Sequence, residues 1–445
     1  MSNAVSARPE ISRLVRYTVV VIASIGFLFD IYEILVGPLI VQPALLELGN
    51  LHPGTPEYRD WAAILFWVPP LVGGFFGFCG GYFTDRFGRR RVLTWSILIY
   101  SAAAFWAGNA ASLQTLLIAR TLAFAGSCVE FVAAVAWLAE IFTEPKQREA
   151  IIGYTQAFSS LGGALSAEIF YLANQHGLSL PAIYSGHSAW RYLLISGMIP
   201  ALPLIFIRPF LPESPEWEYK RKTGTLKRPS VREIFTPQFR KTSIVSSLML
   251  ACAYGCTFGA LQQAPQIAGM IPEVAQMAPQ LRGQATATVQ GTQEIGGLIG
   301  RVVLAALALI IVSRRTLLRL FLIPAVILMP LIYFFTATES LWTFRLTIAI
   351  AGFFTVSQLS FWGIYLPRMY PVHLRGTGEG FAINVGGRMI GTSTSFITTH
   401  LSGIMPGTLV GAKLAYAAAI VGTSTVLLSL ILTFFLPEPP ERIAD

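Results

Sequence analysis

The segment Gly81-Tyr-Phe-Thr-Asp85-Arg86-Phe-Gly88-Arg89-Arg90-Arg91 separates two long apolar stretches and is the most informative part of the chain. A glycine between two helices favours a tight turn, so we predict that the chain turns at Gly88. An aspartate among arginines can pair with them or face a helix N-terminus. We therefore predict that this loop is a charged clasp that holds one end of the molecule closed, formed by Asp85, Arg86, Gly88, Arg89 and Arg90.

The loop stands in a very apolar chain. Of its 445 residues, 54% are hydrophobic and only 12% are charged, and the mean hydropathy is +0.60. A soluble domain has about 25% charged residues, so this chain lacks the ions that cover a water-facing surface. The composition excludes a disordered chain, a coiled coil and a small secreted scaffold, and it argues against a cytosolic enzyme. It predicts a polytopic integral membrane protein.

The apolar stretches predict an all-α fold, because about 20 apolar residues cross a bilayer as a helix. The polar segment 212–240 divides the chain into a six-helix bundle at 1–211, a linker at 212–240 and a second six-helix bundle at 241–445. Three prolines, Pro265, Pro272 and Pro279, predict a broken helix end in the second half. We expect twelve transmembrane helices, at about 17–45, 60–83, 92–110, 113–139, 149–174, 190–211, 241–270, 285–312, 316–337, 341–367, 374–401 and 412–436.

The net charge of +9 could indicate a nucleic-acid partner, but the distribution of the cations favours another reading. With the N-terminus in the cytoplasm, 24 of the 32 Lys and Arg lie on the cytoplasmic side. This is the positive-inside pattern, and it predicts a multi-pass protein of a cell inner membrane with both termini cytoplasmic. No cleavable signal peptide is evident. The other eight are Arg59, Arg191, Arg282, Arg345 and Lys413 outside, and Arg120, Arg301 and Arg388 within spans.

Neither a metal nor a nucleotide is predicted as a cofactor. The four cysteines lie in apolar spans without zinc spacing, and the five histidines lie mostly at loop or span ends. The chain has no G-x-x-x-x-G-K-[ST] motif for binding a nucleoside triphosphate. We expect no cofactor, and we expect the protein to work as a monomer.

The opening segment resembles the signature loop of the major facilitator superfamily, whose pattern is G-x-x-x-D-R-x-G-R-R-R. Pro212-Glu213-Ser214-Pro215-Glu216-Trp217 is similar to the PESPRW motif of sugar porters and of their metabolite:proton symporter relatives. The resemblance implies two pseudo-symmetric six-helix bundles around a central cavity, with alternating access by rocking. Four further residues match family positions, Arg120 in the fourth span and, in the gating loops, Glu140, Arg148 and Arg375.

The chain departs from the family pattern in its second half. The loop between the eighth and ninth spans is only Val312-Ser-Arg314-Arg315, without an aspartate. The glutamate expected seven residues before Arg375 is Arg368. We therefore expect the N-terminal half to carry most of the cytoplasmic clasp.

Ionisable residues inside spans are costly, so each is a candidate functional residue. Asp30 and Glu33 share one face of the first span, and the fourth span carries Arg120 and Glu130. At 1.5 Å per residue, Asp30 lies roughly 20 Å from the inner end and Arg120 roughly 10 Å from the outer end. These depths predict an Asp30–Arg120 pair with Glu33 about one turn further out. Glu130, roughly 15 Å further along than Arg120, is too deep to join them directly.

A carboxylate beside an arginine can couple proton uptake to ligand binding. It is ionised while paired, and it takes a proton when the arginine engages a ligand instead. We predict this role for Asp30, Glu33 and Arg120; a static ion pair is the alternative. The resemblance implies the same, because sugar:proton symporters have an acid in span one and an arginine in span four, and Asp30-Ile-Tyr-Glu33 is similar to the D-G-x-D pattern of aromatic-acid:proton symporters.

Further polar and aromatic residues are candidates for lining the ligand site. Gln262 and Gln263 resemble the Q-Q pair with which sugar porters bind hydroxyls. Gln358, Trp362 and Tyr365 share one face of the tenth span and suit a ligand with a ring or an apolar body. Packing and interhelical salt bridges are the alternatives. The predicted ligand-binding set is Arg120, Glu130, Gln262, Gln263, Gln266, Glu294, Gln358, Trp362, Tyr365, Asn384 and Arg388.

Together these features predict a proton-coupled symporter of a small organic acid or a related polar metabolite. Its expected partners are the substrate, protons and the lipid bilayer, without nucleic acid or nucleotide. Three alternatives remain open, a sugar transporter, an organic-cation or drug:proton antiporter, and a non-transporting membrane receptor of the same fold.

Overall fold

A computed structural model describes residues 12–142, 144–184, 186–200, 202–203, 207, 213–224, 230–337, 339–371 and 374–439. Within these residues the fold is helical, with one isolated β-bridge between Ile183 and Gly186 and no strand. The side chains of some helical residues, including Asp85, Arg148 and Arg375, lie outside this description. The all-α prediction is confirmed.

The N-terminal half is built mainly from long helices that start at clear sequence signals. Ser12, Thr55 and Ser112 each cap a helix by accepting a hydrogen bond from a backbone N–H of the first turn. These helices are α1 (Arg13–Gly49), α2 (Pro56–Phe87), α3 (Arg89–Gly108), α4 (Leu113–Ile141), α5 (Pro145–His176) and α6 (Ala189–Ser196), with the short η1 (Gly177–Ser179) before α6.

The linker and the C-terminal half contain more short segments. The linker holds α8 (Pro215–Thr223) and η3 (Val231–Phe235). Proline breaks the helix where the sequence predicts it, because Pro265, Pro272 and Pro279 each lie in the first turn of a new helix. The rest are α9 (Arg240–Gly259), η4 (Leu261–Gln263), α10 (Ala264–Gly269), α11 (Pro272–Ala275), α12 (Pro279–Ile310), α13 (Arg314–Leu331), η5 (Ile332–Thr336), α14 (Leu341–Thr355), α15 (Gln358–Met369), α16 (Arg375–Gly380), η6 (Phe381–Ile390), η7 (Gly391–Ser393), α17 (Thr394–Leu401), η8 (Ser402–Ile404) and α18 (Val410–Leu432).

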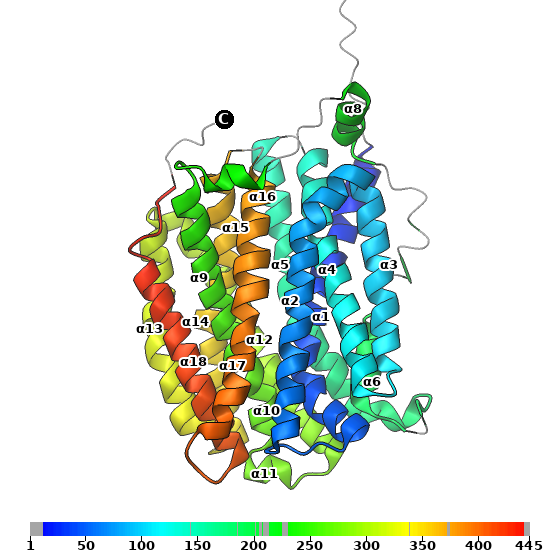
Figure 1. The fold of residues 1–445 in the computed structure, drawn as a ribbon, viewed down its shortest axis with the longest axis vertical. Helices are drawn as coiled ribbons and strands as arrows, with labels where there is room; N and C mark the ends of the chain where they lie inside the picture. Colours follow the sequence, from blue (N-terminus) through cyan, green and yellow to red (C-terminus); the bar gives the residue numbers. More distant parts are fainter. Residues whose placement is uncertain are drawn as a thin grey trace, which may run out of the picture.

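The long helices run side by side along one axis, with α8 at the top of Figure 1 and α10 and α11 at the bottom. We call the end with α8 the linker end and the opposite end the far end. Among the described residues, eight helical stretches are long and apolar enough to cross a membrane. Of the other predicted spans, 92–110 and 149–174 correspond to the continuous helices α3 and α5, 374–401 consists of α16, η6, η7 and α17, and 190–211 includes undescribed residues.

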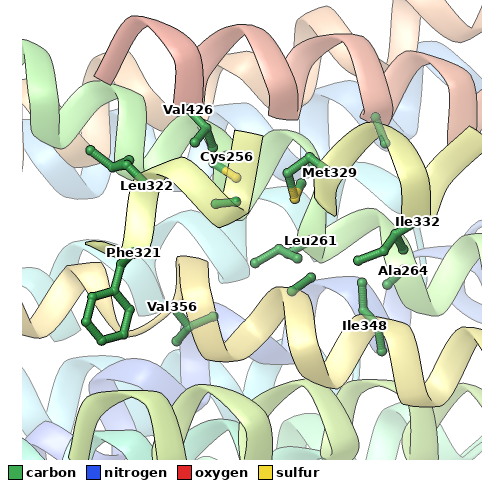
Figure 2. Packing of buried hydrophobic residues seen from close by; sticks show 14 of the residues in the cluster. Cys256, Leu261, Ala264, Phe321, Leu322, Met329, Ile332, Ile348, Val356 and Val426 are labelled. Atoms are coloured by element: carbon green, nitrogen blue, oxygen red, sulfur yellow. The ribbon is translucent and has the colours of Figure 1, made fainter. Parts of the chain in front are cut away.

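Buried hydrophobic side chains form two large clusters. One gathers residues between Val19 and Leu194, with Ala287 from the second half. The other runs from Ile234 to Leu436. Figure 2 shows part of the second cluster, where Cys256, Leu261, Met329, Ile348 and Val426 converge from different helices. Such close packing holds helices together where surrounding lipid is as apolar as the side chains. The boundaries 1–211, 212–240 and 241–445 stay a prediction.

Two pairs of helices join the halves. In one pair α5 packs against α12, and in the other α2 packs against η6 and α17. Polar bonds also cross the interface: Trp67 Nε1 donates to Ser393 Oγ at 2.9 Å, and Tyr58 hydroxyl donates to Gln266 Oε1 at 3.1 Å. Gln290 Nε2 of α12 donates to the Leu35 carbonyl of α1 at 2.9 Å. The interface is therefore partly polar, as a movable contact between two bundles requires.

The loop that opened the sequence analysis forms the predicted tight turn. Gly88 has a φ of 94°, a conformation that favours glycine, and it separates α2 from α3. The first turn of α3 is capped from the linker, since Glu213 Oε1 accepts a hydrogen bond from the Arg90 backbone N–H at 3.0 Å. A carboxylate at a helix N-terminus is favourable for the helix dipole. The turn and the linker are thus one structural unit.

Candidate functional site

Asp30 of α1 lies at the centre of the interface between the halves and is only 2% exposed. Its carboxylate accepts two hydrogen bonds from Nη2 of Arg388, at 2.8 and 3.1 Å, and a third from the hydroxyl of Ser127 on α4. Burying a carboxylate costs several kcal/mol, and a paired cation with further hydrogen bonds offsets that cost. Asp30 therefore has both a cation and a hydroxyl donor as partners.

Arg388 belongs to η6, a ten-residue π-helical stretch of the C-terminal half. Its Nη1 donates to Oδ1 of Asn384 at 3.2 Å, while Nε is buried without a partner among the described residues. Wide helical turns of this kind occur frequently at functional sites. The Asp30–Arg388 pair therefore links this π-helical stretch of the C-terminal half to α1 of the N-terminal half.

A second buried pair lies one turn along α1. Nη1 of Arg120 donates to Glu33 Oε2 at 2.7 Å, and Nη2 of Arg120 donates to the Glu33 backbone carbonyl at 2.6 Å. Both side chains belong to the N-terminal half and are almost fully buried. This pair connects α1 to α4 without touching the other half.

The predicted Asp30–Arg120 pair is wrong. The depth estimate placed Arg120 level with Asp30, but the structure pairs Arg120 with Glu33, three residues further out on α1. One helical turn is 5.4 Å, which is within the error of counting residues from an uncertain span boundary. The estimate also could not include Arg388, which reaches Asp30 from a helix 358 positions away in sequence.

Glu130 occupies a separate position in the N-terminal half. It is fully buried, and a Cβ placed on Gly26 of α1 would lie 2.0 Å from its Oε1. Both carboxylate oxygens lack a hydrogen-bond partner among the described residues. As the depth estimate predicts, it does not join Arg120.

The three glutamines form a buried cluster near the break between α9 and α10. Gln266 Nε2 donates to Gln263 Oε1 at 3.0 Å, and Gln263 Nε2 donates to the Phe258 carbonyl at 3.3 Å. Gln262 is 2% exposed, and both atoms of its amide lack partners within the described residues. Amides without partners are available to a ligand, so Gln262 fits the predicted role.

A cavity of about 490 Å³ lies between the halves toward the far end. Its walls come from α1, α5 and α6 on one side and from α10 and α12 on the other. Of the predicted ligand-binding residues it includes Gln266, with Gln42, Asn174 and Arg282 as further polar groups. Its size suits a small organic molecule.

The aromatic face of the tenth span lies elsewhere. Trp362 and Tyr365 are packed in the C-terminal hydrophobic cluster, and the Tyr365 hydroxyl donates to the Pro437 carbonyl at 2.8 Å. Gln358 Nε2 donates to the Phe354 carbonyl at 2.9 Å. The structure does not bring this set to Asp30 and Arg388. Trp362 and Tyr365 therefore take part in packing, which was the alternative to a ligand-binding role.

Glu294 lies on the interface. It belongs to α12 of the C-terminal half and packs against Gly163 of α5, where an added Cβ would be 2.7 Å from its Cδ. Its Oε1 accepts a hydrogen bond from Gln293 Nε2 at 3.1 Å. Glu294 therefore lies between α12 and α5, where the two bundles meet.

The gating residues that can be described form contacts within the N-terminal half. Nη2 of Arg89 and Glu140 Oε1 are 2.8 Å apart, and Arg89 Nη1 also donates to the Thr84 carbonyl. Arg86 Nη1 donates to the Tyr82 hydroxyl at 2.8 Å. The predicted roles of Asp85, Arg148 and Arg375 concern side chains outside the described ones.

Sequence reasoning missed the corresponding cap in the C-terminal half. Glu438 accepts hydrogen bonds from the backbone N–H groups of Arg314 and Arg315, at 2.9 and 3.1 Å, and from the Ser313 hydroxyl at 2.7 Å. It caps α13 as Glu213 caps α3. The available signal was a repeat, because Leu-Pro-Glu occurs at 211–213 and again at 436–438. We expected the N-terminal half to carry most of the clasp. The C-terminal half has a helix cap of its own, which that expectation did not include.

Two helical bundles that meet on buried charges, with a cavity of small-molecule size between them, are typical of secondary membrane transporters. The family model of the Major Facilitator Superfamily matches residues 22–394, and the chain belongs to this superfamily. It is a multi-pass membrane protein of a transporter family and not an enzyme.

Known relatives support the same conclusion. The chain is 29% identical over 370 residues to a probable 4-methylmuconolactone transporter of Cupriavidus pinatubonensis, covering 81% of this chain and 80% of the relative. It is 24% identical to a sialic acid transporter of Escherichia coli, covering 86% of each. A crystal structure of a D-xylose–proton symporter has the same fold, with a TM-score of 0.70 at 18% identity over 95% of this chain and 98% of that one.

Proposed function

We propose that this protein is a proton-coupled symporter of a small organic acid, driven by the proton gradient without a cofactor. The observation that carries the proposal is the buried Asp30–Arg388 pair between the two halves. A substrate carboxylate that binds Arg388 competes with Asp30 for the same cation. Released from Arg388 in a buried site, Asp30 favours its protonated form. Binding the anion and taking up the proton are then one event.

The same exchange links binding to movement. While Asp30 and Arg388 are paired, they hold α1 and η6 together across the interface. Once the substrate neutralises Arg388 and a proton neutralises Asp30, no buried charge is left unpaired, so the halves can move without a large desolvation cost. In this proposal Glu33 and Arg120 keep α1 aligned on α4 while the halves rock.

The proposed orientation places the linker end in the cytoplasm of a bacterial cell, with the protein in the inner membrane. It follows from the excess of Lys and Arg in the loops at that end. The cavity toward the far end would then face the outside and admit substrate. The relatives named as transporters of a muconolactone and of sialic acid agree with an organic acid.

The proposal is tested by uptake into proteoliposomes with an acidic exterior and a neutral interior. Sialic acid and 4-methylmuconolactone serve as candidate substrates, and D-xylose serves as the neutral comparison. We expect an acid to accumulate only when the pH gradient is imposed. Asp30→Asn should retain exchange of that acid across the membrane but lose accumulation. Accumulation by Asp30→Asn equal to that of the wild type would contradict coupling through Asp30.

A sugar transporter is the second candidate. The buried amide of Gln262, whose two polar atoms have no hydrogen-bond partner in the described part of the chain, is suited to hydroxyl groups. Uptake of D-xylose but of neither acid, with sensitivity to Gln262→Leu, would favour this candidate.

A further inference from the structure

Glu130 is a buried carboxyl that the proposed coupling does not use. It lies in the middle of α4, is fully buried, and has no hydrogen-bond partner on either oxygen among the described residues. We propose that Glu130 is a second proton-binding residue, which holds a proton as a neutral acid while Asp30 is paired with Arg388 and receives the proton of Asp30 during the cycle. This inference rests on the proposed symport, but its test does not.

The environment of Glu130 favours the neutral acid. A buried carboxylate without a partner costs far more than a buried neutral carboxyl. Asp30 satisfies its own charge with Arg388 and Ser127, and Glu33 does so with Arg120. Of these three acids, Glu130 alone has no cation bonded to it in the described part of the chain.

The charged and titratable groups that face Glu130 do not provide that partner. Asp30 on α1 and Arg388 on η6 act on it electrostatically with opposite signs, and their charges are already joined in a bond. Tyr100 on α3 also interacts with Glu130, and its buried hydroxyl forms no hydrogen bond among the described residues. The surroundings are thus close to neutral as well as apolar.

The space for Glu130 is made by Gly26. An added Cβ at Gly26 would overlap Oε1 of Glu130, so the glycine leaves room for the carboxyl in the position it has here. Gly26 is one turn from Asp30, about 6 Å along the helix toward the linker end. Along the axis of α1 toward the linker end, the three acids therefore come in the order Glu33, Asp30 and Glu130. Glu130 belongs to α4 and lies beside Gly26.

In this proposal the proton moves in the same direction, from Asp30 to Glu130 and then toward the linker end. When Glu130 has released its proton toward the linker end, the O–H bond of protonated Asp30 breaks and an O–H bond forms on Glu130. Asp30 returns to its ionised form and pairs again with Arg388.

Infrared spectroscopy of the purified protein in lipid nanodiscs, without substrate, tests the proposal. A protonated carboxyl has a carbonyl band distinct from that of a carboxylate. We expect the wild type to show such a band at neutral pH, Glu130→Gln to lose it, and Asp30→Asn to keep it. In D₂O the band should shift, because a residue that carries protons exchanges them with the solvent. Thermal unfolding controls for correct folding, since glutamine preserves the shape of the side chain.

Two results would overturn the proposal. If the band is absent from the wild type or unchanged in Glu130→Gln, Glu130 is not the protonated group. If the Glu130 band does not shift after prolonged exposure to D₂O, its proton does not exchange with the solvent and the residue has only a packing role. Neither result depends on transport, so a failure of this proposal in the infrared measurement can be told apart from a failure of the symport proposal in the uptake assay.

Discussion

Two buried ion pairs lie three residues apart on α1 and differ in one respect. Asp30–Arg388 and Glu33–Arg120 have nearly equal N···O distances, 2.8 and 2.7 Å, and nearly equal burial. The first joins the two halves, whereas the second stays within one half. A contact between bundles that rock must break in every cycle, but a contact inside a bundle can persist. In the proposed symport, the location of the partner, rather than the strength of the pair, therefore separates the coupling pair from the structural one.

The caps at the linker end extend the comparison. Glu213 and Glu438 each cap a helix of their own half, α3 and α13 respectively. Neither bond has to break when the halves move. We therefore expect contacts across the interface to govern transport and contacts within a half to govern stability.

Replacing Arg388 should have the largest effect. Arg388→Gln removes the cation that Asp30 and the substrate share in the proposed mechanism. We therefore expect uptake of an organic acid to fall about 100-fold, the loss of a charged hydrogen bond worth about 3 kcal/mol. Arg319→Gln is the matched control, because Arg319 binds Thr433 within the C-terminal half at 2.8 Å. Initial uptake rates in proteoliposomes measure both. Equal losses in the two variants would remove the distinction between the two kinds of contact.

Replacing Arg120 should mainly lower stability. Arg120→Gln leaves the carboxylate of Glu33 buried and unpaired, which costs about 3–5 kcal/mol. The double variant Glu33→Gln/Arg120→Gln removes both charges and should regain most of that loss. Thermal unfolding in detergent measures the three proteins. A stable Arg120→Gln whose uptake collapses as in Arg388→Gln would show that the pair within the half also takes part in coupling.

Replacing the caps should have a smaller effect. Glu213→Gln and Glu438→Gln each weaken one cap, and we expect losses of about 0.5–1 kcal/mol in unfolding free energy with uptake nearly unchanged. A loss of uptake in only one variant would show that one cap, and not the other, belongs to the gate.

The effect of Glu438 should depend on pH. Partial burial raises its pKa, but hydrogen bonds from Ser313 and from the backbone of Arg315 and Arg314, with the charge of Arg315, outweigh this and lower it below the ordinary value. A lowered pKa in the folded state stabilises the protein above the ordinary carboxyl pKa, and this stabilisation is lost as pH falls through the lowered pKa. Wild type and Glu438→Gln should therefore differ in melting temperature at pH 7 and converge in acid.

The smallest effect is expected at the far end. His400 and Asp60 form an exposed contact of 3.2 Å between the halves. Exposed pairs contribute only about 0.2–1 kcal/mol, so His400→Gln should leave the melting temperature unchanged. Any effect should be a change of less than about fivefold in uptake rate, as 1 kcal/mol allows. A larger change would mean that this contact, and not Arg388 alone, controls the interface.

Much of the fold could be predicted because it depends on local sequence. Apolar stretches of sufficient length, a glycine at the turn and prolines at the broken helix are each properties of a few neighbouring residues. The site was predicted less well. Asp30, Glu33, Arg120 and Arg388 were all recognised as costly intramembrane charges, yet their pairing was wrong. Pairing depends on differences of one helical turn and on contacts between distant helices, which residue counting does not resolve.

The sequence by itself determined that the chain is a helical membrane protein, roughly where its long helices lie, and that Asp30, Glu33, Arg120 and Arg388 are charges within its spans. These follow from hydropathy, capping residues and the cost of placing an ion in hydrocarbon. The tertiary structure alone decided which carboxylates pair with Arg120 and Arg388, and that Glu130 has no bonded cation among the described residues. A charge in a low-dielectric interior is stabilised only by groups within a few ångströms, and the packing of α1, α4 and η6 sets those distances.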